Sequence, residues 1–181
     1  STSRRQRQMC IRDRYVEMAL QFSRLSAKST DFVIGEVSLD KVVREAIHKY
    51  ARLFVRKKIK LELSPIDAQV LTDEKWLEFV IEQVLSNAIK YTAGGTISVY
   101  LKEEPEQETK ELVIEDTGIG IAPEDLPRIF EKGYTGYNGH ADKRSTGIGL
   151  YLCRKIMRKL SHEITIESEI GVGTKVHLEI R

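Results

Sequence analysis

Two long segments carry apolar side chains at intervals of three and four residues, and this periodicity constrains the fold more than any other pattern. The first follows Ser38, which can cap a helix, and its stripe comprises Leu39, Val42, Val43, Ala46, Ile47, Tyr50 and Phe54. The second starts at Thr72, continues through Asp73 and Glu74 to about Tyr91, and buries Trp76, Leu77, Val80, Ile81, Val84, Leu85 and Ala88. Each apolar stripe must pack against another layer, so the pattern predicts a layered domain.

Shorter segments with alternating apolar and polar residues predict the second layer. Alternation at residues 59–63 predicts a strand that ends before Pro65, and residues 96–102 and 111–115 predict a hairpin around the polar loop 104–110. A last helix is expected at 149–160, followed by strands at 163–168 and 174–180 on either side of a glycine turn at 171–173. The fold class that results is α+β: a two-layer α/β sandwich whose mixed, largely antiparallel sheet is covered on one face by helices.

Composition limits the classes of protein that fit. A chain of 181 residues with 41% hydrophobic side chains can bury one substantial core, and no apolar run approaches the length of about 18 residues that spans a membrane. Cys10 and Cys153 lack the spacing of a zinc site or a disulfide framework. Residues 1–14 hold five arginines against one aspartate, so they contribute +4 to a net charge of +2 and leave −2 for the rest. We therefore expect no nucleic-acid partner.

Polar residues form a row on the second predicted helix. Gln83, Asn87, Lys90 and Tyr91 are spaced four, three and four residues apart and so line one side of it. A solvated helix face is the ordinary interpretation of such a row, and a ligand site is the alternative.

A long stretch from Asp116 to Gly149 is rich in glycine and lacks periodicity, which is uncommon in a compact domain unless the segment is functional. Asp116 ends a predicted strand and is followed at once by Gly118 and Gly120, so its carboxylate lies over backbone without Cβ atoms. A carboxylate accepts a hydrogen bond from an exocyclic amine, which suits adenine better than guanine. An ordinary glycine turn is the alternative.

The segment Thr146-Gly147-Ile-Gly149 opens the last helix, where free backbone N–H groups and the helix dipole favour phosphate. The chain contains no GxxxxGK[ST] loop, and neither glycine pair completes a GxGxxG fingerprint. The two common phosphate-loop families are therefore set aside.

The order of these motifs resembles the ATP-binding domain of sensor histidine kinases, within the superfamily that includes gyrase, heat-shock protein 90 and MutL. The resemblance covers about residues 36–181. Residues 87–92 resemble that family's N box, 116–121 its first glycine box, 127–131 its F box and 146–150 its second glycine box. The F box departs from the family pattern after Phe130, where a second aromatic and a basic residue are commonly found. The resemblance implies a Bergerat-type ATP-binding fold.

It also implies an ATP and magnesium site. Asn87 would hold the metal, Lys90 the phosphates and Asp116 the adenine amine, with Asn87 and Lys90 as the catalytic residues and 131–145 as a lid. The expected nucleotide-binding residues are Asn87, Lys90, Tyr91, Asp116, Gly118, Gly120, Ile121, Lys143, Arg144, Thr146, Gly147, Gly149 and Leu150. Gln83 stands where ATP-hydrolysing relatives carry a glutamate, and an amide cannot take a proton from water, so hydrolysis by that route is disfavoured.

The implied function is the catalytic domain of a two-component kinase that phosphorylates a histidine for relay to a response regulator. None of the four histidines has the sequence surroundings of a phosphate-accepting histidine, so the helix that carries the acceptor would lie upstream. Residues 15–35 would then be the remnant of the second dimerisation helix with a linker, and residues 1–14 would be a charged linker or a sequencing artefact. The parent is expected to be a membrane-anchored homodimer whose catalytic domain is cytoplasmic, similar to small kinases that respond to envelope stress and peptide antibiotics. A degenerate nucleotide-binding or scaffolding module of the same fold, an ATP-driven clamp and an anti-sigma-type serine kinase are the alternatives.

Overall fold

The computed structural model describes residues 20, 23–24, 32–102, 108–134 and 149–181. The chain divides into two units, Ser1–Phe32 and Val33–Arg181. In the first unit Leu20, Ser23 and Arg24 are helical, and most of the helix expected at 15–25 lies outside the described residues. All elements named below belong to the second unit.

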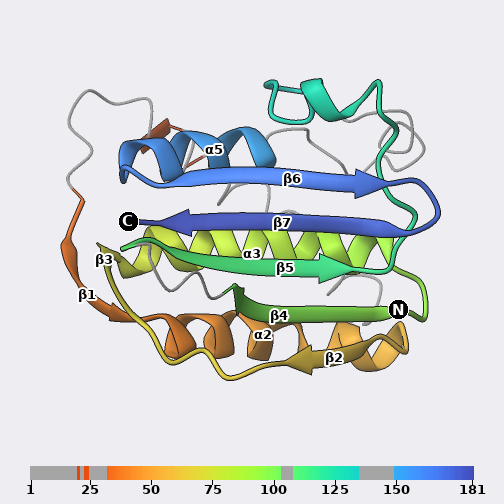
Figure 1. Ribbon diagram of the computed structural model, residues 1–181, viewed down its shortest axis with the longest axis horizontal. Coiled ribbons are helices and arrows are strands. Elements are labelled where there is room, and N and C mark those ends of the chain that lie inside the picture. Colours follow the sequence, from red (N-terminus) through yellow and green to blue (C-terminus); the bar gives the residue numbers. More distant parts are fainter. Residues whose placement is uncertain (1–19, 21–22, 25–31, 103–107, 135–148) are drawn as a thin grey trace. The chain divides into compact units, whose positions relative to one another are not determined.

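A five-stranded mixed sheet forms one layer of the second unit (Figure 1). In spatial order its strands are β2 (Lys60–Leu63), β4 (Thr96–Lys102), β5 (Lys110–Asp116), β7 (Gly173–Ile180) and β6 (Glu163–Glu169). β2 runs parallel to β4 and every other pair is antiparallel. The predicted mixed, largely antiparallel sheet and the hairpin of β4 and β5 are confirmed.

Three helices cover one face of this sheet, as predicted. Within the part of the chain that the structure describes they are α2 (Leu39–Arg56), α3 (Glu74–Tyr91) and α5 (Gly149–Lys159), and a 3-10 turn, η1, spans Leu126–Arg128. α3 packs between α2 and α5 and against β5, and Figure 1 shows α2 and α3 behind the strands. The apolar stripes, which include the fully buried Leu85 of α3, meet the inward residues of the strands, among them Ile97, Leu112, Ile114 and Leu178, all fully buried.

The helix caps follow local chemistry. The Ser38 hydroxyl accepts a hydrogen bond from the backbone N–H of Lys41, as predicted for the cap of α2. The start of α3 differs from the prediction by two residues, because Asp73 is the cap and accepts from the backbone N–H of Trp76 at 3.1 Å. Thr72 belongs to the preceding strand, and its hydroxyl lies 2.9 Å from Nε2 of the buried His162.

A two-stranded antiparallel sheet, β1 (Ile34–Ser38) with β3 (Gln69–Asp73), was not predicted. Each strand has only five residues, and their pairing joins segments more than 30 residues apart, so no local period marks it. The Asp73 carboxylate also accepts from the backbone N–H of Val33 at 2.8 Å, which ties this small sheet to the start of α3.

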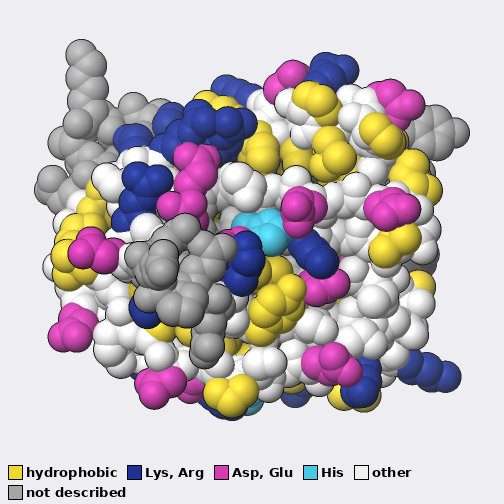
Figure 2. All heavy atoms as spheres, in the orientation of Figure 1, with side chains coloured by type: hydrophobic (Ala, Val, Ile, Leu, Met, Phe, Trp, Pro, Cys, Tyr) yellow, Lys and Arg dark blue, Asp and Glu magenta, His cyan; other side chains and the backbone are white. Residues whose placement is uncertain are grey.

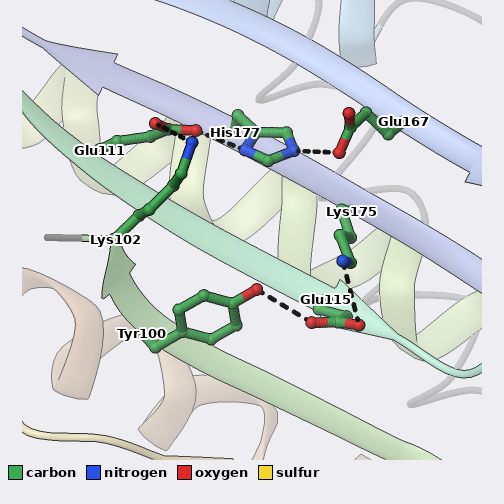
Figure 3. A network of polar contacts seen from close by, with 7 residues as sticks. All are labelled: Tyr100, Lys102, Glu111, Glu115, Glu167, Lys175 and His177. Carbon is green, nitrogen blue, oxygen red and sulfur yellow. Dashed lines mark hydrogen bonds and ion pairs between the residues drawn. The ribbon is translucent and has the colours of Figure 1, made fainter. Parts of the chain in front are cut away.

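The other face of the large sheet carries charged side chains that pair with one another (Figure 3). His177 lies between two carboxylates, with Nδ1 2.5 Å from Glu111 and Nε2 2.9 Å from Glu167. Lys102 lies 3.4 Å from Glu111, and Lys175 lies 3.9 Å from a Glu115 carboxylate oxygen. The charges on this face are therefore balanced locally. Within the described residues, no helix has the length and apolar character needed to cross a bilayer.

Candidate functional site

The site lies where α3 ends beside the end of β5. α3 presents the half-buried side chains of Asn87, Lys90 and Tyr91 in its last turns, and Lys90 Nζ lies 5.1 Å from the centroid of the Tyr91 ring. Lys57, just after α2, donates from Nζ to the carbonyl oxygens of Ile89 and Lys90, the latter at 3.1 Å. These bonds occupy carbonyls that a helix end leaves without partners, so Lys57 fixes the end of α3.

Asp116 is the last residue of β5 and is only 8% exposed. Its Oδ1 accepts a hydrogen bond from the backbone N–H of Gly118 at 2.8 Å. Burial raises the pKa of Asp116 above its ordinary value of 3.8, while hydrogen bonds from the backbone of Gly118 and Thr174 act in the opposite direction. The chain thus holds a buried carboxylate that no cationic side chain neutralises through an ion pair within the described residues.

Close backbone contacts join the loop after β5 to its surroundings. A Cβ atom on Gly118 would lie 2.4 Å from the carbonyl oxygen of Tyr91, and the N–H of Ile119 donates to that same oxygen at 3.1 Å. A Cβ atom on Gly173 would lie 1.9 Å from the carbonyl oxygen of Asp116. Any other residue at these positions would push the loop, the end of α3 and the β6–β7 turn apart.

One buried hydroxyl at this junction lacks a partner among the described residues. Thr92 Oγ1 is shielded from solvent and makes no hydrogen bond to any of them, and a Cβ atom on Gly118 would lie 2.9 Å from it. Unsatisfied buried polar atoms are rare and commonly mark a site for a bound water or a ligand. The carboxylate of Asp116 and this hydroxyl lie on the same side of Gly118, and both are groups that form hydrogen bonds with a flat polar group such as a purine base.

The structure brings together one part of the predicted set. Gly118 contacts both the Asp116 carboxylate and the backbone carbonyl of Tyr91, and Gly120 lies in the same loop, against the carbonyl of Glu169. Ile121 donates its backbone N–H to Ser168 Oγ at 2.8 Å.

The remaining predicted residues lie apart from this junction or cannot be placed. Asn87 makes no hydrogen bond to Asp116 or Gly118 within the described residues, and Gly149 and Leu150 form the half-buried start of α5. Four predicted nucleotide contacts lie outside the described residues, namely Lys143, Arg144, Thr146 and Gly147. The described residues contain no group of three or more His, Cys, Asp or Glu side chains arranged to hold a metal ion.

Three residues of the junction were missed from the sequence. Thr92 was noticed only as the end of a motif, and Gly173 only as part of a turn, although the spacing Gly171-x-Gly173 resembles that of Gly118-x-Gly120. Lys57 gave no signal, because nothing in the sequence shows that it reaches the end of a helix more than 30 residues later.

Comparison with known proteins agrees with this geometry. The family described as histidine kinase-, DNA gyrase B- and HSP90-like ATPase matches residues 72–181. The sensor histidine kinase YxdK of Bacillus subtilis is 39% identical over 162 residues, which cover 89% of this chain and 50% of that protein. The sensor protein BceS of the same organism is 36% identical over 159 residues, or 88% of this chain and 47% of that protein. The chain thus spans about half the length of these relatives.

Solved structures support the same fold. Full-length ShkA in complex with AMPPNP aligns with a TM-score of 0.75 and 22% identity, over 91% of this chain and 34% of that one. The Acinetobacter baumannii histidine kinase AdeS aligns with a TM-score of 0.76 and 21% identity, over 96% of this chain and 80% of that one. The junction of α3 with the loop after β5 lies inside the matched region of the family. The chain therefore belongs to the family of histidine kinase-, DNA gyrase B- and HSP90-like ATPases.

Proposed function

We propose that this chain is the ATP-binding catalytic domain of a two-component sensor histidine kinase. The observation that carries the proposal is the buried Asp116 carboxylate held against the end of α3 by Gly118. In the parent protein the domain transfers the γ-phosphoryl group of ATP to a histidine on a dimerisation helix, from which a response regulator receives it. The resemblance to sensor kinases such as YxdK and BceS supports this assignment.

Asp116 selects the base. Its ionised carboxylate accepts from the exocyclic amine of adenine and repels the carbonyl oxygen that guanine presents at the equivalent position. Gly118 lets the loop after β5 lie directly against the backbone carbonyl of Tyr91, and this close packing holds the Asp116 carboxylate beside the end of α3. The Thr92 hydroxyl, which has no hydrogen-bond partner among the described residues, supplies a further polar group beside Gly118.

Asn87 and Lys90 serve the phosphates. Mg²⁺ commonly keeps several waters and is bound through one or two protein oxygens together with substrate phosphates, so a single amide oxygen such as that of Asn87 fits its needs. When bound, the metal neutralises charge that develops on the phosphates. Lys90 places an ammonium group one turn further along the same helix. Gly149 and Leu150 begin α5, whose free N–H groups favour phosphate, and Lys143, Arg144, Thr146 and Gly147 complete the proposed set.

Gln83 lies one turn before Asn87 on α3 and is half-buried. Because an amide is not a proton acceptor for water, this position favours transfer to a protein acceptor over hydrolysis. The proposed parent is a homodimer anchored in the membrane with this domain in the cytoplasm, and residues 15–35 are the end of its dimerisation hairpin with the linker to the domain at 36–181.

Calorimetric titration of this chain with ADP and GDP, each with and without magnesium, tests the proposal. We expect ADP to bind, GDP to bind at least tenfold more weakly, and magnesium to strengthen the binding of ADP. Asn87→Ala should remove the magnesium effect while leaving metal-free ADP binding near that of the parent. Equal affinity for ADP and GDP would contradict the adenine role of Asp116, and an unchanged magnesium effect in Asn87→Ala would contradict the metal role.

A further inference from the structure

The outward face of α5 forms a groove that the nucleotide site does not use. Its lining residues share a basic or aromatic side chain and are Phe130, Tyr151, Arg154, Lys155, Arg158 and Lys159. On α5 these positions recur at intervals of three and four, opposite the buried stripe of Leu152, Cys153, Ile156 and Met157. Phe130 lies just beyond η1, and the groove has a volume of about 460 Å³.

The charge of this groove is not balanced by the helix that carries it. α5 contains four cationic residues and no acidic one, and the like-charged pairs Arg154 with Arg158 and Lys155 with Lys159 are four residues apart. Like charges four residues apart on a helix repel one another and lower its stability. Figure 2 shows the dark blue side chains gathered at the upper left, where α5 lies in Figure 1.

Two of the cations are available to a partner. Neither Arg154 nor Arg158 forms an ion pair with the described residues, and Arg154 Nε is buried without a hydrogen-bond acceptor. The Arg154 guanidinium group lies 5.0 Å from the centroid of the Phe130 ring. The cations of the opposite sheet face, by contrast, lie beside carboxylates of neighbouring strands. A guanidinium held on an aromatic ring presents its planar fork of donors to a carboxylate.

We propose that this groove binds an acidic segment of a protein partner, in which carboxylates flank an apolar side chain. Arg154 and Arg158 pair with the carboxylates, and Phe130 and Tyr151 pack against the apolar side chain. The interaction goes beyond the proposed nucleotide function, because the groove includes neither Asp116 nor the first residues of α5.

The dimensions and charge favour a protein segment over other anions. A helix of 11 residues is about 16 Å long, so its cationic stripe spans few phosphates of a nucleic acid. Beyond residues 1–14 the chain carries a net charge of −2, which opposes a long polyanion or an anionic membrane outside the stripe. Two aromatic side chains within the groove supply contact area for an apolar side chain, which a bare phosphate group does not use.

A fluorescent helical peptide with glutamates four residues apart around a central leucine is the probe, and the same peptide with glutamine at those positions is its control. Fluorescence anisotropy without nucleotide should show that the glutamate peptide binds at least tenfold more tightly than the glutamine peptide. Arg158→Glu should weaken that binding about tenfold, because it removes one ion pair and adds a repulsion. Arg52→Glu makes the same charge change on exposed α2 and should have no effect.

Several outcomes would overturn the proposal. The first is equal binding of the two peptides, and the second is an equal loss of affinity for the glutamate peptide in the Arg52→Glu and Arg158→Glu variants. The third is tighter binding of a 12-residue single-stranded DNA, or of phosphatidylglycerol vesicles, than of the glutamate peptide. Titration of Arg158→Glu with ADP separates the two proposals. If Arg158→Glu loses peptide binding but keeps its affinity for ADP, the result supports the groove as a site separate from the nucleotide site. If the parent chain binds the peptide but not ADP, only the proposed nucleotide function is rejected.

Discussion

Replacing Asp116 by asparagine separates the binding role of this side chain from its structural role. The two side chains have the same shape, and the asparagine Oδ1 can still accept from the backbone N–H of Gly118, which now lies 2.8 Å from the carboxylate. What disappears is the negative charge and one of the two acceptor oxygens, and with them the backbone hydrogen bond from Thr174 and the charge-assisted hydrogen bond to an adenine amine. We therefore expect affinity and stability to respond differently.

The affinity should fall substantially. Hydrogen bonds to charged groups contribute about 1.5–3 kcal/mol, so losing the charge should weaken ADP binding about 10- to 150-fold. Stability at neutral pH should fall little, because the lost hydrogen bond from Thr174 is offset by the removal of a charge that burial disfavours, as the raised pKa of Asp116 shows. At pH values between 3.8 and the raised pKa, Asp116 keeps its proton in the folded chain but has released it in the unfolded chain. The parent thus loses stability as pH rises through that window, and the asparagine variant does not.

Calorimetry with ADP and urea unfolding at about pH 4 and about pH 7 measure both effects. Asp67→Asn is the matched control, since Asp67 is an exposed aspartate far along the chain from the site, and it should change neither quantity. The reasoning is refuted if Asp116→Asn binds ADP as tightly as the parent. It is also refuted if the variant is markedly less stable than the parent at neutral pH, because the carboxylate would then be a structural group.

Three further changes test the surroundings of the site. Lys57→Met removes the donor from two carbonyls at the end of α3 and should lower the free energy of unfolding by about 1–2 kcal/mol and weaken ADP binding, whereas Lys57→Arg should preserve much of both. Gly173→Ala adds a Cβ atom 1.9 Å from a backbone oxygen, at a residue with φ +143, and should lower the free energy of unfolding in urea by about 2–3 kcal/mol. Gly171→Ala is the control and should lower it less, because Gly171 has φ +78 but open space around its Cβ position. His162 is buried, and its pKa is lowered, chiefly by burial. The stability that this residue contributes is therefore present above about pH 6.5 and is lost as the pH falls through its pKa in the folded chain. The unfolding midpoints at about pH 7.5 and pH 5.5 should differ less in His162→Gln than in the parent.

The described secondary structure was largely predictable because its signals are local. The apolar stripes of α2 and α3 recur every three or four residues, and β4 and β5 alternate around a short polar loop. The small sheet of β1 and β3 was missed because its register depends on residues distant in sequence. The helix predicted to start at Thr72 starts at Glu74, because Asp73 caps it and Thr72 lies in the preceding strand with its hydroxyl against His162, a residue distant in sequence.

The chemistry of the proposed site was already present in the motifs, whereas its assembly was not. A carboxylate followed by two glycines and a polar row on a helix indicate a ligand by residue type alone, since carboxylates accept amines and glycines admit close approach. Only the tertiary structure decided that Gly118 lies against the carbonyl of Tyr91, that Lys57 closes the end of α3, and that Thr92 remains buried without a partner among the described residues. These contacts join segments separated by tens of residues, and the packing of α3 between the other helices and the sheet, rather than any local pattern, determines them.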